Sequence, residues 1–412
     1  MTRVIALAAF FALAAILAPV AASGARVEIP FYPMHSPTCA ARSLQMVLSF
    51  YGYNYSVSLL LQLMGWDYGA FYMPQYHFGY GIGVYPVNAV ITACRYLGFN
   101  VTVLRFSSFS KAIEELRSYL ASGVPVILQL RGHTIVATGI NGSYILVNDP
   151  SGGIYSCKVV ELASYLGLGK ELGDHLEVLK RECRAGGKDL AIPLERLRDL
   201  WESWYGYFTA IVVKPSKPVT SLSSIDWSSV LERAAELERG SSYPYASGVY
   251  AWMEFARDLE TYFTNVSSHS LELFWDAETM LEIASARRLD AASFLEGLAA
   301  SSGCRVLANA SWALERASDY FARARQLVLW AIAHRNHVDE SRKAVLEAAK
   351  YVKLGAEMDA KAARLLDEAS TCFRNRAGGS SLGLLGYELI ATCLAIAAAA
   401  IALALLAKRL RI

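Results

Sequence analysis

The chain has 412 residues, of which 54% are hydrophobic, and its formal net charge at pH 7 is +2. This length allows two domains, and the near-zero charge gives no electrostatic reason to expect nucleic-acid binding. Much of the apolar excess lies at the two ends of the chain.

The first 25 residues have the pattern of a signal peptide. Arg3 precedes an unbroken apolar run over 4–22, and small residues follow at 23–25, which suits cleavage by a signal peptidase. An uncleaved N-terminal anchor helix is the alternative interpretation.

Residues 26–216 are predicted to form one domain in which helices pack on an antiparallel sheet. Asn141-Gly142 is a strong hairpin turn, and short strands separated by turns favour antiparallel pairing. Residues 151–190, rich in glycine and charge, are interpreted as an insertion. Helices are expected over 39–51, 86–98, 110–122 and 192–205, and strands over 101–106, 124–130, 133–140, 144–147 and 208–213.

A Pro-containing break over 214–218 opens a predicted linker, residues 217–225. Nothing in the following segment, 226–376, has a strand pattern, and its apolar residues recur at helical spacing. We therefore expect a helical bundle or stalk with helices over 226–239, 248–265, 270–300, 309–335 and 339–372.

The C-terminal segment predicts a membrane anchor. Residues 382–407 carry one charge, Glu388, and a basic tail follows over 408–412. A transmembrane helix with a cytoplasmic tail is expected, which would make the protein a single-pass membrane protein with its N-terminal domains extracellular. Five of the nine asparagines stand in Asn-x-Ser/Thr, which predicts glycosylation at Asn54, Asn100, Asn141, Asn265 and Asn309.

The seven cysteines allow two disulfides outside the cell. The candidate partners are Cys157 with Cys183 and Cys304 with Cys372, although sequence alone cannot decide connectivity. We expect no cofactor and no metal: His334 and His337 are three residues apart but have no carboxylates placed alongside them.

Three residues suggest chemistry. Cys39 begins a predicted helix, whose free N–H groups and dipole favour a thiolate. His133 opens one strand of the predicted hairpin and Asp149 follows the other, so the turn brings the two side chains together. A thiol, an imidazole base and an orienting carboxylate are the set that nucleophilic acyl transfer requires. Each residue alone has an ordinary structural explanation as packing, surface or turn.

The segment Pro30–Gly52 resembles the opening of the papain-like bacteriocin-processing (double-glycine) peptidase family and its broad relatives. Together with the preceding Ile29 it reads IPFYPMHSPTCAARSLQMVLSFYG. LRGHTIVATG and YILVNDPSG resemble that family's histidine and aspartate strands. The resemblance covers about 28–215 and implies an α+β papain-like fold. It also implies that Cys39 is the nucleophile, His133 the general base and then acid, and Asp149 the orienting group.

Two departures from the family stand out. Ala40 follows the cysteine where the family normally has Gly. Pro33 and Met34 occupy the places of a glutamine whose amide helps to bind the oxyanion. His35 is a candidate substitute donor.

The sequence therefore predicts a membrane-anchored extracellular cysteine peptidase or amidase-like hydrolase acting on a peptide or protein substrate. The alternative is an inactive peptidase fold that binds peptide or cell-wall partners, and a third interpretation makes the bundle an assembly stalk for a surface protein partner. Three roles are open for the aromatic segment 65–85: lining a substrate groove, packing on the bundle, or contacting lipid headgroups.

Overall fold

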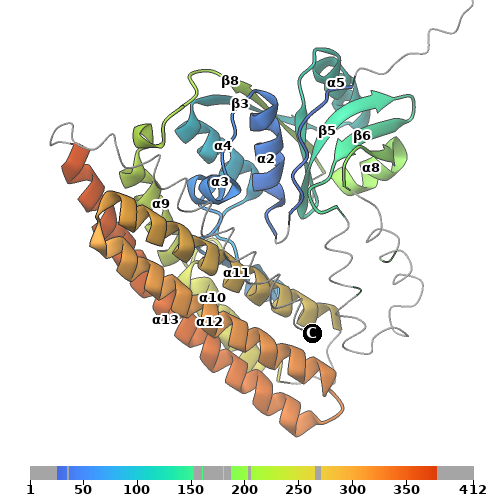
Figure 1. The fold of residues 1–412 in the computed structure, drawn as a ribbon. Helices are drawn as coiled ribbons and strands as arrows, with labels where there is room; N and C mark the ends of the chain where they lie inside the picture. Colours follow the sequence, from blue (N-terminus) through green and yellow to red (C-terminus); the bar gives the residue numbers. More distant parts are fainter. Residues whose placement is uncertain are drawn as a thin grey trace, which may run out of the picture.

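The computed structural model describes residues 26–34, 37–152, 160, 180, 187–202, 206–264 and 271–377. It has an α+β domain above a set of long helices that run diagonally beneath it (Figure 1). An α+β domain followed by a helical region fits the sequence prediction.

A six-stranded sheet whose neighbouring strands are all antiparallel forms the centre of the α+β domain. Its strands, in spatial order, are β3 (Phe99–Phe106), β8 (Phe208–Pro215), β4 (Val126–Leu130), β5 (His133–Asn141), β6 (Tyr144–Asn148) and β7 (Leu190–Pro193). The N-terminal segment lies along β5, where the Val27 N–H donates to the Thr138 carbonyl at 2.7 Å.

The helices of this domain are α2 (Cys39–Phe50), α3 (Val57–Met64), α4 (Pro86–Leu97), α5 (Phe109–Ala121) and α8 (Leu194–Trp201). The helix predicted over 192–205 begins later, because Ile192 pairs with Ile145 in the sheet as part of β7. α3 was not predicted. Its ends are well defined, since the Ser56 hydroxyl caps it by accepting from the Leu59 N–H and Gly65 ends it in the left-handed conformation.

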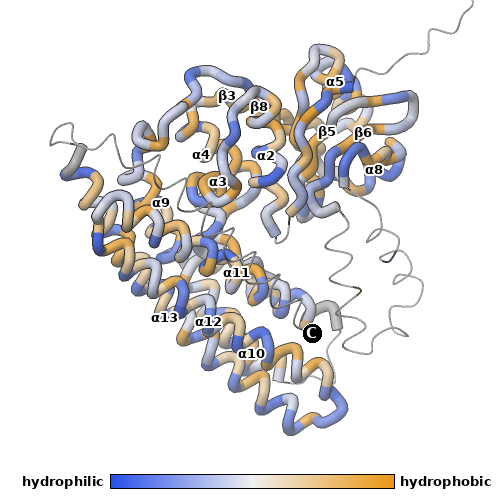
Figure 2. The backbone as a smooth tube through the Cα atoms, viewed as in Figure 1, coloured by the Kyte–Doolittle hydropathy of each residue, from blue (hydrophilic) through white to orange (hydrophobic). Residues whose placement is uncertain are grey.

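Five further helices form the helical region: α9 (Trp227–Arg239), α10 (Val249–Thr261), α11 (Leu271–Ser302), α12 (Arg305–Ala333) and α13 (Val338–Ala377). Hydrophilic and hydrophobic residues alternate along α12 and α13 (Figure 2), as bundle helices with one buried face require. The Asp226 carboxylate caps α9 by accepting from the Ser229 N–H at 3.2 Å.

A second, three-stranded sheet joins the two regions. β1 (Phe71–Met73) pairs with β2 (Phe78–Tyr80) on one side and with β9 (Ala246–Ser247) on the other. The short helix η1 (Pro74–Tyr76) lies between β1 and β2, and η2 (Leu222–Ser224) precedes α9. The sequence pattern predicts no strand after residue 226, and β9 contradicts this prediction. A strand of two residues is too short to show the alternation of polar and apolar residues by which strands are recognised.

One hydrophobic core cluster spans the α+β domain and part of the helical region, and a second cluster lies mostly within the helical region. Buried residues of α2, α3 and β5 belong to the same cluster as residues of α9, α11, α12 and α13. One buried ion pair crosses this contact, between Arg287 and Asp67 at 3.2 Å. Arg288 pairs with Glu238 at 3.0 Å and Asp359 at 2.8 Å inside the helical region, and it donates across the contact to the Gly81 carbonyl at 3.2 Å. The helical region therefore packs directly against the α+β domain.

The predicted membrane anchor requires correction. Across the part of the chain that the structure describes, every helix is too short or too polar to cross a bilayer. The helix predicted over 382–407 and the signal peptide predicted over 1–25 lie outside the described residues. We therefore correct the fold class to an α+β domain followed by a helical region, and we withdraw the single-pass, extracellular localisation.

Candidate active site

Cys39 is the first residue of α2, with 9% of its surface exposed. The preceding Thr38 is not helical, and the first bond of the helix runs from the Arg42 N–H to the Thr38 carbonyl at 2.9 Å. The chain entering the helix is held by Trp66, whose indole N–H donates to the Pro37 carbonyl at 3.1 Å. Cys39 therefore stands in the first turn of α2, whose backbone N–H groups have no partner within the helix.

His133 and Asp149 meet across the hairpin of β5 and β6. Gly132, in the left-handed conformation at φ +75°, turns the chain into β5, and His133 is its first residue. Pairing with β6 ends at Val136 and Asn148, so Asp149 lies just beyond the ladder. Its Oδ1 is 2.7 Å from His133 Nε2. Both side chains remain about a quarter exposed, so the pair is accessible to solvent.

Hydrogen bonding connects the sulfur to this pair. Burial opposes ionisation of the thiol, but the hydrogen bond and charge of His133 outweigh it and hold the pKa of Cys39 below its usual value. Burial likewise favours neutral imidazole, yet hydrogen bonds with Asp149 and Cys39 raise the pKa of His133 to about 10. Because Nε2 contacts Asp149, Nδ1 is left for the sulfur. The arrangement favours a thiolate–imidazolium pair.

The Asp149 carboxylate is itself held in the ionised form. Burial raises its pKa, but the hydrogen bond and charge of His133 outweigh burial, so the pKa of Asp149 lies below its usual value. Ser151 also contributes, donating to Oδ1 from its N–H at 2.8 Å and its hydroxyl at 2.7 Å. Sequence reasoning missed Ser151, although an Asp two residues before a Ser in a turn is a recognisable signal for this bond.

Thr134 is a second residue that sequence reasoning missed. It is fully buried next to His133, and its backbone and hydroxyl groups help to lower the Cys39 pKa. The Ser43 hydroxyl of α2 donates to the Thr134 carbonyl at 3.0 Å, which ties the helix to β5. The register between helix and strand that creates this contact has no signal in the local sequence.

The places that the family's glutamine would occupy contain no side-chain donor here. Met34 is buried, with 6% exposure, and its N–H donates to the Pro150 carbonyl at 2.7 Å. Its thioether has no N–H or O–H. The candidate donor His35 lies outside the described residues.

The other residues predicted as sites do not belong to this hydrogen-bonded group where the structure describes them. Cys157 and Cys183 lie outside the described residues, whereas Cys304 and Cys372 are free thiols joined by a hydrogen bond. The predicted disulfide between the latter two is therefore not formed in this structure. Among the sequon asparagines, Asn265 lies outside the described residues and the others are exposed: Asn54, Asn100, Asn141 and Asn309.

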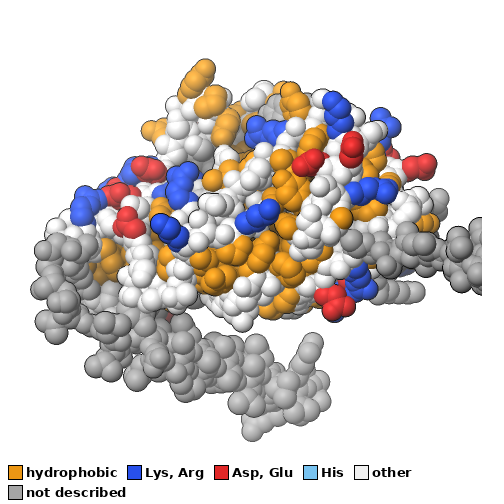
Figure 3. All heavy atoms as spheres, turned by 90° about the horizontal axis from the view of Figure 1, so that it is seen from above, with side chains coloured by type: hydrophobic (Ala, Val, Ile, Leu, Met, Phe, Trp, Pro, Cys, Tyr) orange, Lys and Arg blue, Asp and Glu red, His pale blue; other side chains and the backbone are white. Residues whose placement is uncertain are grey.

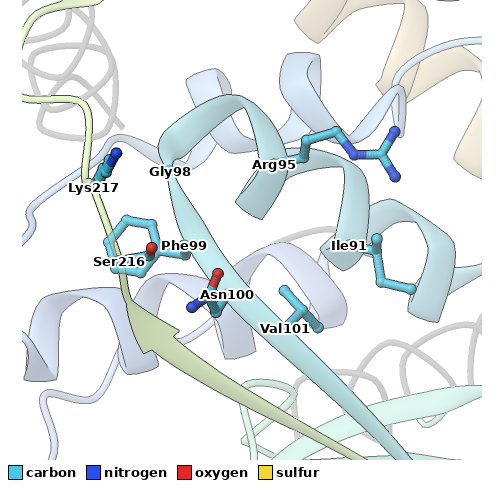
Figure 4. A pocket seen from close by; sticks show the side chains of 8 residues that line it. All are labelled: Ile91, Arg95, Gly98, Phe99, Asn100, Val101, Ser216 and Lys217. Atoms are coloured by element: carbon cyan, nitrogen blue, oxygen red, sulfur yellow. The ribbon is translucent and has the colours of Figure 1, made fainter.

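A surface hollow elsewhere on the described part of the chain does not include the candidate catalytic residues. A shallow hollow of about 340 Å³ lies between α4 and the ends of β3 and β8, where Arg95 and Lys217 stand on opposite sides of Gly98 (Figure 4). These two cations do not converge, and none of the three candidate catalytic residues lines the hollow. On the face seen from above, Lys and Arg are interspersed with Asp and Glu (Figure 3). Within the described residues, no His, Cys, Asp or Glu groups form a metal site.

Comparison with known proteins agrees with the resemblance inferred from the sequence. Residues 26–171 match the model of the Peptidase_C39 like family. A comparison with curated proteins finds no match. Among solved structures, the chain is similar to a double glycine motif protease from an AMS/PCAT transporter, crystallised in complex with the leader peptide. The two share 19% identity with a TM-score of 0.28, over 46% of this chain and 94% of the other.

Proposed function

We propose that this protein is a thiol hydrolase that cleaves a peptide or a related amide, with Cys39 as nucleophile. The observation that supports this proposal most directly is the hydrogen-bonded series of Cys39 at the start of α2, His133 at the start of β5 and Asp149 after β6. The match of residues 26–171 to a peptidase family model is consistent with it.

The reaction follows from the charges of the three groups. The Cys39 thiolate attacks the carbonyl carbon of the amide, and the His133 imidazolium donates its proton to the leaving nitrogen, which departs as an amine. The product on the protein is a thioester. Water then attacks the thioester carbon while His133 accepts its proton, and the carboxylic acid leaves as Cys39 regains the thiolate. Asp149 keeps the imidazole oriented throughout.

The negative charge that develops on the carbonyl oxygen during attack needs hydrogen-bond donors to stabilise it. The backbone N–H of Cys39 precedes the first hydrogen bond of α2 and supplies one, assisted by the helix dipole. His35 is the proposed second donor, because Met34 has none to offer.

A fluorescent thiol-directed peptide probe tests the proposal. We expect it to label the native protein at Cys39, and Cys39→Ala to abolish both labelling and amide cleavage. Cys94→Ala is the matched control, since burial raises the pKa of Cys94 and leaves it a thiol. Labelling that survives in Cys39→Ala would refute the assignment.

The absence of a side-chain donor at Met34 favours one alternative, an inactive peptidase fold that binds peptides. Such a protein would retain peptides on the native surface without turning them over. Equilibrium binding of a fluorescent peptide, unchanged in Cys39→Ala and accompanied by no cleavage product, would support this binding function.

A further inference from the structure

The segment that connects α3 to α4 presents an aromatic surface beside His133. The register of β1 and β2 pairs Phe71 with Tyr80 and Met73 with Phe78. Because alternate residues of a strand share a face, these four side chains lie on one side of the three-stranded sheet. Tyr72 and Gly79 lie on the other side, where Tyr72 is 1% exposed and packs on Phe255 of α10.

Rings on the outer side contact one another. The centroids of Phe71 and Tyr80 are 5.7 Å apart in a stacked arrangement, and those of Phe78 and Tyr80 are 5.5 Å apart. Tyr245, 51% exposed and next to β9, adds a ring 6.1 Å from Phe71. We call Phe71, Phe78, Tyr80 and Tyr245 the aromatic platform. Its side chains carry no charge, so the residue that it suits is apolar or aromatic.

The platform adjoins the candidate active site. A Cβ built on Gly132 would lie 3.6 Å from the Tyr80 hydroxyl oxygen, and Gly132 immediately precedes His133. Tyr80 therefore lies beside the residue that leads into His133, which places one ring of the platform next to the start of β5.

The helical region holds the platform in place. A Cβ on Gly81 would lie 2.5 Å from the Met280 carbonyl oxygen, and one on Gly79 would lie 2.9 Å from the Met280 sulfur. Glycine at both positions thus allows β2 to lie directly on α11. β9 and Tyr245 come from the helical region itself.

We propose that the aromatic platform is a substrate subsite that binds an apolar or aromatic side chain of the peptide next to the bond that is cleaved. The helical region then serves recognition, because it holds β2 and contributes one ring. This inference rests on the proposed function and adds a substrate preference to it.

The test compares two reagents on the same sulfur. Iodoacetamide reports the reactivity of Cys39 without a peptide. A set of acetylated tripeptidyl acyloxymethyl ketones, with Phe or Asp at each position in turn, reports the reactivity of Cys39 together with recognition. In the native protein we expect one Phe ketone to label Cys39 at least about tenfold faster than its Asp counterpart.

Tyr80→Ala and Phe71→Ala should each remove most of that preference while iodoacetamide alkylates Cys39 at the native rate. Tyr144→Ala is the matched control: Tyr144 is 47% exposed at the opposite end of the hairpin from His133, and its loss should leave the preference unchanged. Tyr80→Phe, which keeps the ring, should retain the preference and guards against a folding defect.

Native preference in Tyr80→Ala and Phe71→Ala would overturn the subsite. Failure of iodoacetamide to alkylate Cys39 selectively in the native protein would instead overturn the proposed function. The two failures are therefore distinguishable.

Discussion

Arg287 of α11 forms an ion pair with Asp67 of the α+β domain, with Nη1 and Oδ1 3.2 Å apart and both side chains excluded from solvent. The Gln62 amide also donates to Asp67 at 2.6 Å. Burial exceeds the effect of Arg287 and raises the pKa of Asp67 to about 7. The carboxyl group that joins the two regions therefore titrates near neutral pH.

This pKa predicts a pH dependence of stability. In the unfolded chain Asp67 titrates near pH 4, so between about pH 4 and 7 the folded state binds more protons than the unfolded state. The free energy of unfolding should fall as pH rises through that window, by roughly 2–4 kcal/mol from this group. Urea unfolding at several pH values measures it.

Two variants isolate the contribution of Asp67. Asp67→Asn should flatten the pH profile of the unfolding free energy relative to the native protein. Asp319→Asn, at an exposed carboxylate paired with Arg316, should leave the profile unchanged. An Asp67→Asn profile parallel to the native one would show that the group does not titrate in this range.

The active-site charges predict how alkylation depends on pH. Because His133 holds the pKa of Cys39 below its usual value, iodoacetamide should still alkylate Cys39 rapidly at pH values where an ordinary thiol, with a pKa near 8.5, is slow. Amide cleavage should decline only as the imidazolium is lost near pH 10.

Asp149→Ala should change the pH dependence of both Cys39 alkylation and amide cleavage. Loss of the carboxylate lowers the His133 pKa, so the alkaline decline in cleavage shifts to lower pH, and the weaker imidazolium lets the Cys39 pKa rise. We expect turnover to fall by about 10²–10⁴. Alkylation and cleavage profiles of Asp149→Ala that superimpose on the native ones would contradict the role of this group.

His35 offers a test of oxyanion binding. If its side chain donates to the developing oxyanion, His35→Ala should lower kcat by about 10²–10³. The rate of Cys39 alkylation should not change, because iodoacetamide forms no oxyanion at a carbonyl. Native turnover in His35→Ala would leave the backbone N–H groups of α2 as the donors.

Cys304 and Cys372 are hydrogen-bonded thiols at the start of α12 and near the end of α13. We expect oxidised glutathione to convert them to a disulfide, closing a long loop and stabilising the fold by about 4 kcal/mol. Burial and the Cys372 hydrogen bond raise the pKa of Cys304 to about 11, so the reaction should accelerate with pH. The melting temperature and the number of thiols titrated in denaturant are measured before and after oxidation. Cys372→Ser, which cannot form this disulfide, is the control. A thiol count that does not fall by two on oxidation would rule out the disulfide.

Local signals in the sequence were enough to predict several parts of this protein. The Asn141-Gly142 turn and its flanking alternation determine the β5–β6 hairpin, and that hairpin brings His133 beside Asp149. Amphipathic spacing predicts the long helices α12 and α13. Each of these depends on residues close in the chain, so pattern and structure agree.

Only the tertiary structure decided the remainder. Ile192 has a helical pattern but pairs with Ile145, and β9 exists only because Phe71 and Tyr72 lie beside it. The contact of Thr134 with Cys39 likewise depends on how α2 packs against β5.

The contact between the α+β domain and the helical region is the largest feature that depends on tertiary structure. Arg287 reaches Asp67 across 220 residues of chain, and both side chains are buried where the two regions meet. Periodicity identifies which face of a helix is apolar, but it does not identify the surface that covers that face. That surface forms only when folding brings distant segments together, and here it places the helical region beneath the α+β domain.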